Sequence, residues 1–194
     1  MAHEMQKSVI RRLNDSRFIR EYFIGNGIDI GSGEDSLLKY KEFFPAAKSI
    51  RAWDINDGDA QYLSSIEDCS FDFAVSSHCL EHMISPEIAL TNWIRVVKSR
   101  GYLIITVPDE DLYEQGVWPS MFNSDHKFTF TINKDNSWSP KSVNVLDLLS
   151  KLNKEISIKK IELLDNLHFK SLHGIDQTRY TFSESAIEIV LKKL

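Results

Sequence analysis

The sequence has little of what marks secreted, fibrous or disordered proteins. Its two cysteines, Cys69 and Cys79, are too few for a disulfide framework, so we expect a reduced, cytoplasmic location. Eight glycines and five prolines among 194 residues do not fit a fibrous or low-complexity chain. No apolar run reaches the length that spans a membrane, and the N-terminal residues lack the apolar core of a signal peptide.

Positive charge is also scarce. The chain has 23 Lys and Arg against 28 Asp and Glu, a formal net charge of −5, with no basic block that would bind a nucleic-acid backbone. We therefore expect a small-molecule partner and neither nucleic acid nor membrane. A content of 42% hydrophobic and 26% charged residues is typical of one soluble domain. We expect that domain to span residues 1–194, with N-terminal helices over residues 1–24, and the oligomeric state stays open.

The most informative segment is a short apolar strand that runs into a glycine-rich turn. Residues 27–31 form the strand, Gly31 and Gly33 mark the turn, and residues 37–44 form an amphipathic segment. This order is typical of nucleotide-binding α/β domains, in which glycine lets a ligand approach the backbone. A further strand ends at Asp54, 21 residues after Gly33, where a carboxylate can accept hydrogen bonds from both ribose hydroxyls. The sequence thus predicts an adenosine ligand.

Hydrophobic periodicity predicts that strands and helices alternate along the chain. The expected strands are residues 27–31, 49–54, 71–76, 102–107, 156–164 and 185–192. The expected helices are residues 4–23 with a break at 14–16, 35–44, 85–100, and one that begins at Ser139 and Pro140. This pattern indicates a doubly wound, mostly parallel α/β sheet whose last strand is antiparallel.

Two local features refine this pattern. Ser85 and Pro86 are the expected N-cap and first residue of the best-marked helix, and Gly101 is expected to end it. Only 15 residues, 56–70, separate the second strand from the third, too few for a helix and another parallel strand. We therefore expect the sheet to be shortened at the edge of its second strand.

With these elements in this order, the chain resembles the class I S-adenosylmethionine-dependent methyltransferases, in particular small bacterial ones. The resemblance rests on five motifs, namely Asp29–Gly33, Asp54, Gly58–Leu63, Phe71–His82 and Gly101–Pro108. It implies a Rossmann-like fold, S-adenosylmethionine as the cofactor and S-adenosylhomocysteine as its product. Asp35 stands where the family often has a third glycine, and we interpret it as the N-cap of the helix that follows.

The resemblance also implies a set of cofactor-binding residues. These are Asp29, Gly31 and Gly33 for the methionine end, Asp54 for the ribose, Asp59 and Ala60 for the adenine, and Ser76 and Ser77 at the exit of the next strand. A side chain at Gly31 is expected to fill the space that the cofactor needs. With the usual third strand missing, the adenine is expected to depend on residues 55–63 alone.

The segment 109–138 is too long for a plain connection, and we expect it to form an inserted acceptor loop at the carboxyl edge of the sheet. Its motifs, Val107–Gly116 and Ser124–Thr131, resemble a bacterial subgroup associated with surface-polysaccharide loci. That resemblance implies O-methyl transfer to a carbohydrate acceptor, a sugar or sugar nucleotide, within polysaccharide biosynthesis.

Three histidines are candidates for the general base that a hydroxyl acceptor needs. His78 and His82 leave the carboxyl end of a strand, where ligands bind in open α/β sheets. His126 lies in the insertion beside Asp125, which we expect to orient its ring. We predict His126 as the base, with His82 and His78 as the next candidates, and each of them can instead be an ordinary capping or loop residue.

Two other interpretations stay open. Residues His78 to His82 match the H-x-x-E-H pattern of inverted zinc peptidases, which would make the chain a zinc hydrolase that uses His78 and His82 on one helical face. Because no third ligand is evident, we assign no residue to a metal. Alternatively, the chain is a non-catalytic S-adenosylmethionine-binding domain, since a fold can persist without its activity.

Overall fold

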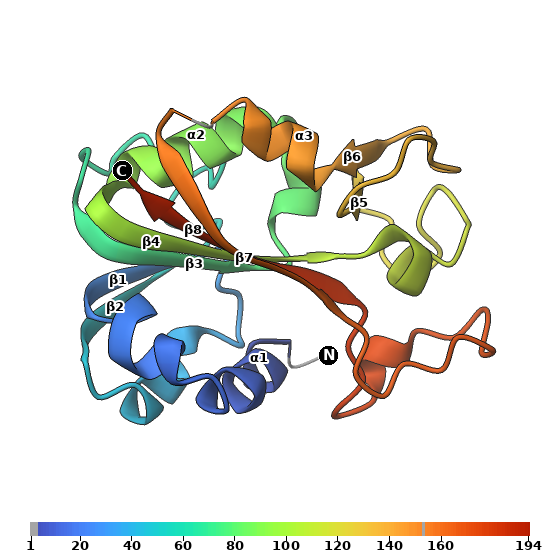
Figure 1. Cartoon of the computed structure of the whole chain (residues 1–194), viewed down its shortest axis with the longest axis horizontal. Coiled ribbons are helices and arrows are strands. Elements are labelled where there is room, and N and C mark those ends of the chain that lie inside the picture. The colour runs from blue at the N-terminus through green and yellow to red at the C-terminus, as the bar shows by residue number, and fades with distance from the viewer. Residues whose placement is uncertain (1–3, 153) are drawn as a thin grey trace.

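The computed structural model describes residues 4–152 and 154–194. Its central element is a six-stranded sheet with the strand order β2-β1-β3-β4-β8-β7 (Figure 1). Its strands are β1 (Gly25–Ile30), β2 (Ala47–Trp53), β3 (Phe71–Ser77), β4 (Val97–Pro108), β7 (Ile156–Leu164) and β8 (Ala186–Lys193). The first four are parallel, and β8 pairs antiparallel with both β4 and β7. The predicted mostly parallel sheet with an antiparallel last strand is confirmed.

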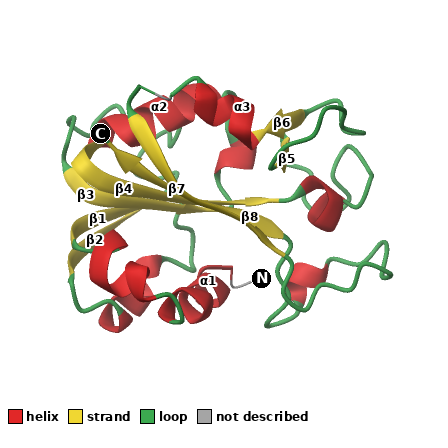
Figure 2. Ribbon diagram, in the orientation of Figure 1, coloured by secondary structure: helices red, strands yellow, loops and turns green. Residues whose placement is uncertain are grey.

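Helices cover both faces of this sheet. The helix α1 (Glu4–Leu13) and the short helical turn Phe18–Tyr22 lie on one face, and α2 (Pro86–Val96) and α3 (Val145–Ser150) lie on the other (Figure 2). Because successive strand residues point to opposite faces, the core divides into two clusters. Ile104 of β4 packs on the α1 side, and Ile105 packs on the α2 side. No helix in the described ranges is both long and apolar enough to cross a membrane.

The edge formed by β2 is short, as the sequence predicts. Residues 56–70, all of which the structure describes, form turns, and no strand lies between β2 and β3 along the chain. Arg95 of α2 holds this connection by donating hydrogen bonds to the carbonyl oxygens of Leu63 and Ile66, at 3.1 and 2.8 Å. Because no further strand covers this edge, the loop that follows Trp53 is exposed, and Ile55 within it is 85% exposed.

Helix α2 begins as predicted and ends earlier than predicted. The Ser85 hydroxyl accepts a hydrogen bond from the Ile88 N–H, and Pro86 is the first helical residue. The helix ends at Val96 instead of reaching Gly101, because Val97 already pairs with Phe71 of β3. Strand pairing therefore replaces the last helical turn that the sequence predicts.

Two other boundaries also differ from the predictions. The segment Leu37–Phe43 is a 3-10 helix, and its N-cap is Ser36, not Asp35. Helix α3 begins at Val145 rather than at Ser139, with Asn144 as its N-cap. The intervening residues are drawn into a small second sheet, in which β5 (Thr129–Thr131) and β6 (Ser142–Asn144) pair in parallel.

Candidate active site

The glycine loop after β1 lies directly against the end of β2. The N–H groups of Gly31 and Ser32 both donate to the carbonyl oxygen of Trp53, at 2.9 and 3.1 Å. Gly31 and Gly33 have positive φ angles of 71° and 50°, a conformation that glycine adopts at low cost. The turn thus sets the loop next to Asp54, as the sequence predicts for one ligand bridging both.

The two glycines leave different spaces around them. A side chain at Gly31 would collide with the sulfur of Cys79, which packs beneath the loop. A side chain at Gly33 would meet no described atom within 4 Å. The expectation that a Gly31 side chain fills the cofactor's space is therefore wrong, because its Cβ direction points into the protein. Gly33 is the position that borders open space.

Asp29, at the end of β1, is fully buried and only half satisfied. Its Oδ2 accepts hydrogen bonds from the Ser36 hydroxyl at 2.8 Å and from the Leu37 N–H at 2.7 Å. Its Oδ1 has no partner among the described residues. Burial raises the pKa of Asp29 to about 6, and the two hydrogen bonds moderate that rise. The carboxylate thus orders the loop with one oxygen and keeps the other available.

Of the two serines at the end of β3, one hydroxyl is hydrogen-bonded within the protein and the other is not. The Ser76 hydroxyl donates to the Ile30 carbonyl oxygen at 3.0 Å and ties β3 to β1. The Ser77 hydroxyl is buried, and it has no hydrogen-bond partner in the described part of the chain. Of this predicted pair, Ser77 is therefore the residue free to bind a ligand, and Ser76 supports the strand.

A cavity of about 500 Å³ joins these groups. Its walls include four of the predicted cofactor residues, Asp29, Gly31, Gly33 and Ser77, together with the first turn of α1. That turn is held over the loop by the Gln6 N–H, which donates to Asp35 at 3.1 Å. Among the charged side chains that line it, the acidic ones predominate, with Glu4, Asp29, Glu34 and Asp35 against Lys39.

The predicted ribose and adenine residues lie outside this cavity wall. Asp54 sits in a turn closed by the Asp57 N–H, which donates to the Asp54 carbonyl oxygen at 2.7 Å. Asp59 begins the next turn by accepting from the Gln61 N–H, and Ala60 accepts from the Trp93 indole with its carbonyl oxygen. These residues form an open surface beside the glycine loop, as the shortened sheet edge implies.

A second cavity, of about 600 Å³, adjoins the first and has Glu4 and His78 in common with it. All three predicted histidines, His78, His82 and His126, line this second cavity. The insertion after β4 supplies much of its wall, including Tyr113 and Phe122. The insertion is fixed to the turn after β3 because the Lys127 N–H donates to the Glu81 carbonyl oxygen at 2.8 Å.

The histidines surround one carboxylate, that of Glu81. Glu81 is 0% exposed, and neither carboxylate oxygen has a hydrogen-bond partner among the described residues. Its Oε1 lies 3.6 Å from Nδ1 of His78 and 4.0 Å from Nε2 of both His82 and His126. Burial raises the pKa of Glu81 and the adjacent histidines lower it, and the net shift is downward. We name Glu81, His78, His82 and His126 the histidine cluster.

Other carboxylates orient the two rings of this cluster that face Glu81 with Nε2. His126 donates from Nδ1 to Glu114 at 2.7 Å, and both side chains are almost fully buried. His82 donates from Nδ1 to Asp125 at 2.9 Å. The expectation that Asp125 orients His126 is thus wrong, because the turn at residues 123–126 directs Asp125 toward His82 instead.

The zinc-peptidase interpretation of residues 78–82 does not match the backbone. Leu80–His82 is a single 3-10 turn, and His78 has a positive φ of 52°. The two histidines therefore do not share one helical face as that pattern requires. Sequence reasoning also missed Glu81 and Glu114 as site residues. The motif contained Glu81, but its burial depends on the insertion that closes over it.

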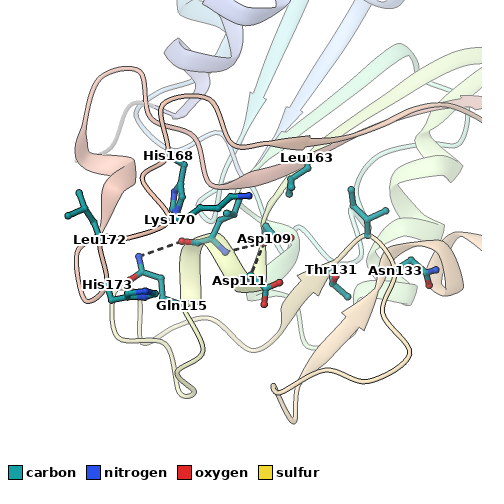
Figure 3. Close-up of a pocket in the computed structure, with 12 residues that line it drawn as sticks. Asp109, Asp111, Gln115, Thr131, Asn133, Leu163, His168, Lys170, Leu172 and His173 are labelled. Atoms are coloured by element: carbon teal, nitrogen blue, oxygen red, sulfur yellow. Dashed lines mark hydrogen bonds between the residues drawn. The ribbon is translucent and has the colours of Figure 1, made fainter.

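A third cavity, of about 440 Å³, lies apart from these two and shares no described lining residue with them. In Figure 3, Asp109 and Asp111 lie between His168 and Lys170 on one side and Thr131 on the other. None of the predicted site residues lines it. We therefore place the candidate site in the first two cavities.

Comparisons with known proteins concern the fold and the class of reaction. Residues 27–105 match the family model described as a methyltransferase domain. The structure resembles an S-adenosylmethionine-dependent methyltransferase from Archaeoglobus fulgidus, with a TM-score of 0.65 and 19% identity over 98% of this chain and 94% of that one. A similar enzyme structure from Aquifex aeolicus has a TM-score of 0.53 and 13% identity over 97% and 98%. No curated protein sequence matches the chain.

One further similar structure limits what the fold can say. The [4+2]-cyclase SpnF matches with a TM-score of 0.54 and 14% identity over 96% of this chain and 81% of that one. The same architecture thus serves more than one reaction, so the structural likeness shows the fold alone. The family model over residues 27–105 supports methyl transfer as the class of reaction, and with it S-adenosylmethionine as the cofactor.

Proposed function

We propose that this chain transfers a methyl group from S-adenosylmethionine to a hydroxyl group of a small acceptor, a sugar or a sugar nucleotide. The observation that carries the proposal is that two cavities, one at the glycine loop and one at the histidine cluster, have Glu4 and His78 in common in their walls. A cofactor in the first and an acceptor in the second would meet at that junction. Methyl transfer needs such a junction, because the acceptor oxygen must lie about 3 Å from the methyl carbon.

The first cavity suits the methionine end of the cofactor. The free Oδ1 of Asp29 and the free hydroxyl of Ser77 are buried polar atoms that a ligand with an ammonium and a carboxylate group would satisfy. Gly33 leaves the approach to the loop backbone open. The excess of carboxylates around the cavity would also favour a sulfonium cation over the neutral thioether product.

The adenosine end would lie on the open surface beside the loop. We assign the ribose hydroxyls to Asp54 and the adenine to Asp59 and Ala60, which all follow β2. Ile55, exposed next to Asp54, offers an apolar surface for the base. This arrangement makes the adenosine half of the site the more weakly enclosed half.

The second cavity suits a hydroxylated acceptor with a phosphate. Tyr113 and Phe122 give it an aromatic wall, against which the apolar face of a sugar ring can pack. Among the described residues that line the cavity, Arg179 is the guanidinium; its Nε donates to Asp176 at 3.2 Å, and its remaining N–H groups are of the kind that bind phosphate well. These two features together support a sugar nucleotide as the acceptor.

The proposed step is a direct displacement. The acceptor oxygen forms a bond to the methyl carbon as the carbon–sulfur bond breaks, and the bonding electron pair stays on sulfur. The acceptor hydroxyl loses its proton in the same step, and the histidine cluster lies where that proton must be handled. Among its members His126 is our first candidate for contact with the acceptor, followed by His82 and His78.

Labelled methyl transfer tests this function. The protein is incubated with S-adenosylmethionine carrying a radioactive methyl group and with nucleotide sugars, free sugars and the small-molecule fraction of a cell extract. We expect the label in an acid-stable product that co-migrates with a methylated sugar or sugar nucleotide. If the protein binds the cofactor and labels nothing, it is a non-catalytic S-adenosylmethionine-binding domain.

A further inference from the structure

The histidine cluster contains an electrostatic contradiction if only its own residues are considered. Glu81 is a fully buried carboxylate that accepts no hydrogen bond from the described residues. Buried charges are normally paired and hydrogen-bonded, because burial without compensation is costly. Yet the nitrogens nearest to Glu81 lie 3.6 to 4.0 Å away, beyond hydrogen-bonding distance.

The tautomers of the two rings sharpen this contradiction. Both His82 and His126 use Nδ1 to donate to a carboxylate, Asp125 and Glu114 respectively. A neutral imidazole that donates from Nδ1 carries a lone pair on Nε2. When both rings are neutral, two lone pairs point toward the anion of Glu81, an arrangement that is unfavourable unless a proton or a metal ion lies between them.

The dimensions of the cluster fit a metal ion. One oxygen of Glu81 and one nitrogen each of His82 and His126 all lie within 4.8 Å of one another. Bonds of about 2.1 Å in tetrahedral geometry place ligand atoms roughly 3.4 Å apart. The observed 4.0 Å from Glu81 to each Nε2 closes by a few tenths of an ångström per side chain, and the two histidine nitrogens, which lie within 4.8 Å of each other, close by up to about 0.7 Å each.

The surroundings of the three residues also match a metal centre. In such centres a ligating histidine donates its other ring N–H to a carboxylate, which fixes the tautomer and aims the ring. Here Glu114 does this for His126, and Asp125 does it for His82. The cluster opens on the second cavity, so an ion would keep coordination positions for a ligand from that side.

We propose that Glu81, His82 and His126 bind a divalent transition-metal ion such as zinc or iron(II). Two imidazoles and one carboxylate are a ligand set that these ions accept, whereas magnesium prefers oxygen ligands. Three protein ligands with open positions are typical of catalytic rather than structural sites. His78 lies at the side of this set and faces the cofactor cavity.

A role for this ion rests on the proposed function. A bound metal ion lowers the pKa of a hydroxyl that it coordinates, which is the activation that a sugar hydroxyl needs. In that role His82 and His126 hold the ion, and the acceptor's proton leaves to solvent instead of passing to His126. The binding of the metal itself depends on Glu81, His82 and His126 alone and needs no cofactor.

Metal titration in the absence of S-adenosylmethionine tests the proposal. Protein freed of metal by a chelator is titrated with Zn²⁺ against a colorimetric chelator, and with Co²⁺ while its visible absorption is recorded. We expect one ion per chain and a Co²⁺ spectrum of low coordination number. Glu81→Gln and His126→Ala should each weaken Zn²⁺ binding at least 100-fold, and Glu114→Gln, which replaces the orienting carboxylate by a neutral amide, about 10–100-fold.

His173→Ala is the matched control, because His173 is exposed and lines the third cavity. It should bind Zn²⁺ as the wild type does. If Glu81→Gln or His126→Ala fails to fold, His82→Ala at the half-buried position gives the same test. Absence of stoichiometric binding of Zn²⁺ and Co²⁺ by the wild type, or equal binding by the wild type and the folded ligand variants, overturns the proposal.

The same preparations separate this proposal from the proposed function. Methyl transfer that proceeds equally in the metal-free protein would leave the proposed function intact and refute the metal's role. Metal binding without any binding of S-adenosylmethionine would refute the proposed function and leave the metal site itself intact.

Discussion

Two fully buried glutamates show how differently this molecule treats the same side chain at two positions. Glu188, in the middle of β8, accepts hydrogen bonds from Arg12 at 2.8 Å, Arg11 at 2.7 Å and Lys160 at 2.9 Å. Glu81, at the exit of β3, accepts none from the described residues and faces histidine nitrogens at 3.6 to 4.0 Å. Both are 0% exposed.

The difference separates a structural group from a functional one. The cations around Glu188 come from α1 and β7 and join both elements to β8, so this carboxylate completes its interactions within the fold. The histidine side chains around Glu81 border a cavity, and their nitrogens do not come within hydrogen-bonding distance of the Glu81 carboxylate. A group that the protein buries without satisfying is a candidate for satisfaction by a ligand.

The largest effect expected is on stability, and it falls on Glu188. Glu188→Gln leaves the buried Arg12 without its anion, and breaking a buried ion pair costs about 3–5 kcal/mol. Glu81→Gln, the same substitution in metal-free protein, breaks no hydrogen bond and should cost about 1 kcal/mol or less. Urea unfolding of both variants measures the comparison. Equal losses would remove the distinction between the two carboxylates.

Low pH should remove the stabilisation that Glu188 contributes. The ion pairs lower the pKa of Glu188 to about 2 against the opposing effect of burial. Because this folded-state pKa lies below the ordinary value, the stabilisation is complete above pH 4.5 and is lost as the pH falls through 2. It amounts to about 3 kcal/mol at neutral pH. The stability gap between wild type and Glu188→Gln should therefore narrow in acid, and a gap constant to pH 2.5 contradicts the account.

Gly33 lines the first cavity, where we propose that the cofactor binds, and it can be compared with Gly174, which does not line that cavity. Both have positive φ and open space around them, so a valine causes similar backbone strain of about 1–2 kcal/mol at either position. Gly33→Val also fills the cavity, and we expect its affinity for S-adenosylmethionine to fall by more than tenfold in calorimetry. Gly174→Val should bind the cofactor as the wild type does. Unchanged affinity of folded Gly33→Val places the cofactor elsewhere.

The smallest effect concerns the open half of the cofactor site. Asp54→Ala removes a carboxylate that would accept from the ribose hydroxyls, and such a charge-assisted hydrogen bond contributes about 1.5–3 kcal/mol. Calorimetry should show an affinity at least tenfold lower. Asp147→Ala, at an exposed acid on α3, is the control and should change nothing. A folded Asp54→Ala with wild-type affinity means that the ribose does not contact this residue.

The sequence predicts what local patterns determine. The sheet, the shortened edge and the start of α2 follow from apolar alternation, from the length of residues 56–70 and from the Ser85–Pro86 cap. The errors arise where tertiary pairing overrides local preference. Val97 leaves its helix for β3, and residues 142–144 leave the predicted helix for β5.

In the candidate site, too, the sequence predicts the local motif but not the contacts between distant segments. The glycine loop is a local motif, and its residues could be named from the sequence. Glu114, His126 and Glu81 are separated along the chain and meet only when the insertion closes on the turn after β3. For the same reason adjacency in sequence wrongly paired Asp125 with His126, whereas in space Asp125 contacts His82.

The most direct test of this account is the rate of methyl transfer by Glu81→Gln at saturating S-adenosylmethionine, measured beside its cofactor affinity. We expect calorimetry to give the wild-type affinity, because Glu81 does not line the cofactor cavity. We expect label transfer to the acceptor to fall at least 100-fold, because the histidine cluster loses the carboxylate at its centre. A folded Glu81→Gln that transfers the methyl group at the wild-type rate would contradict the account.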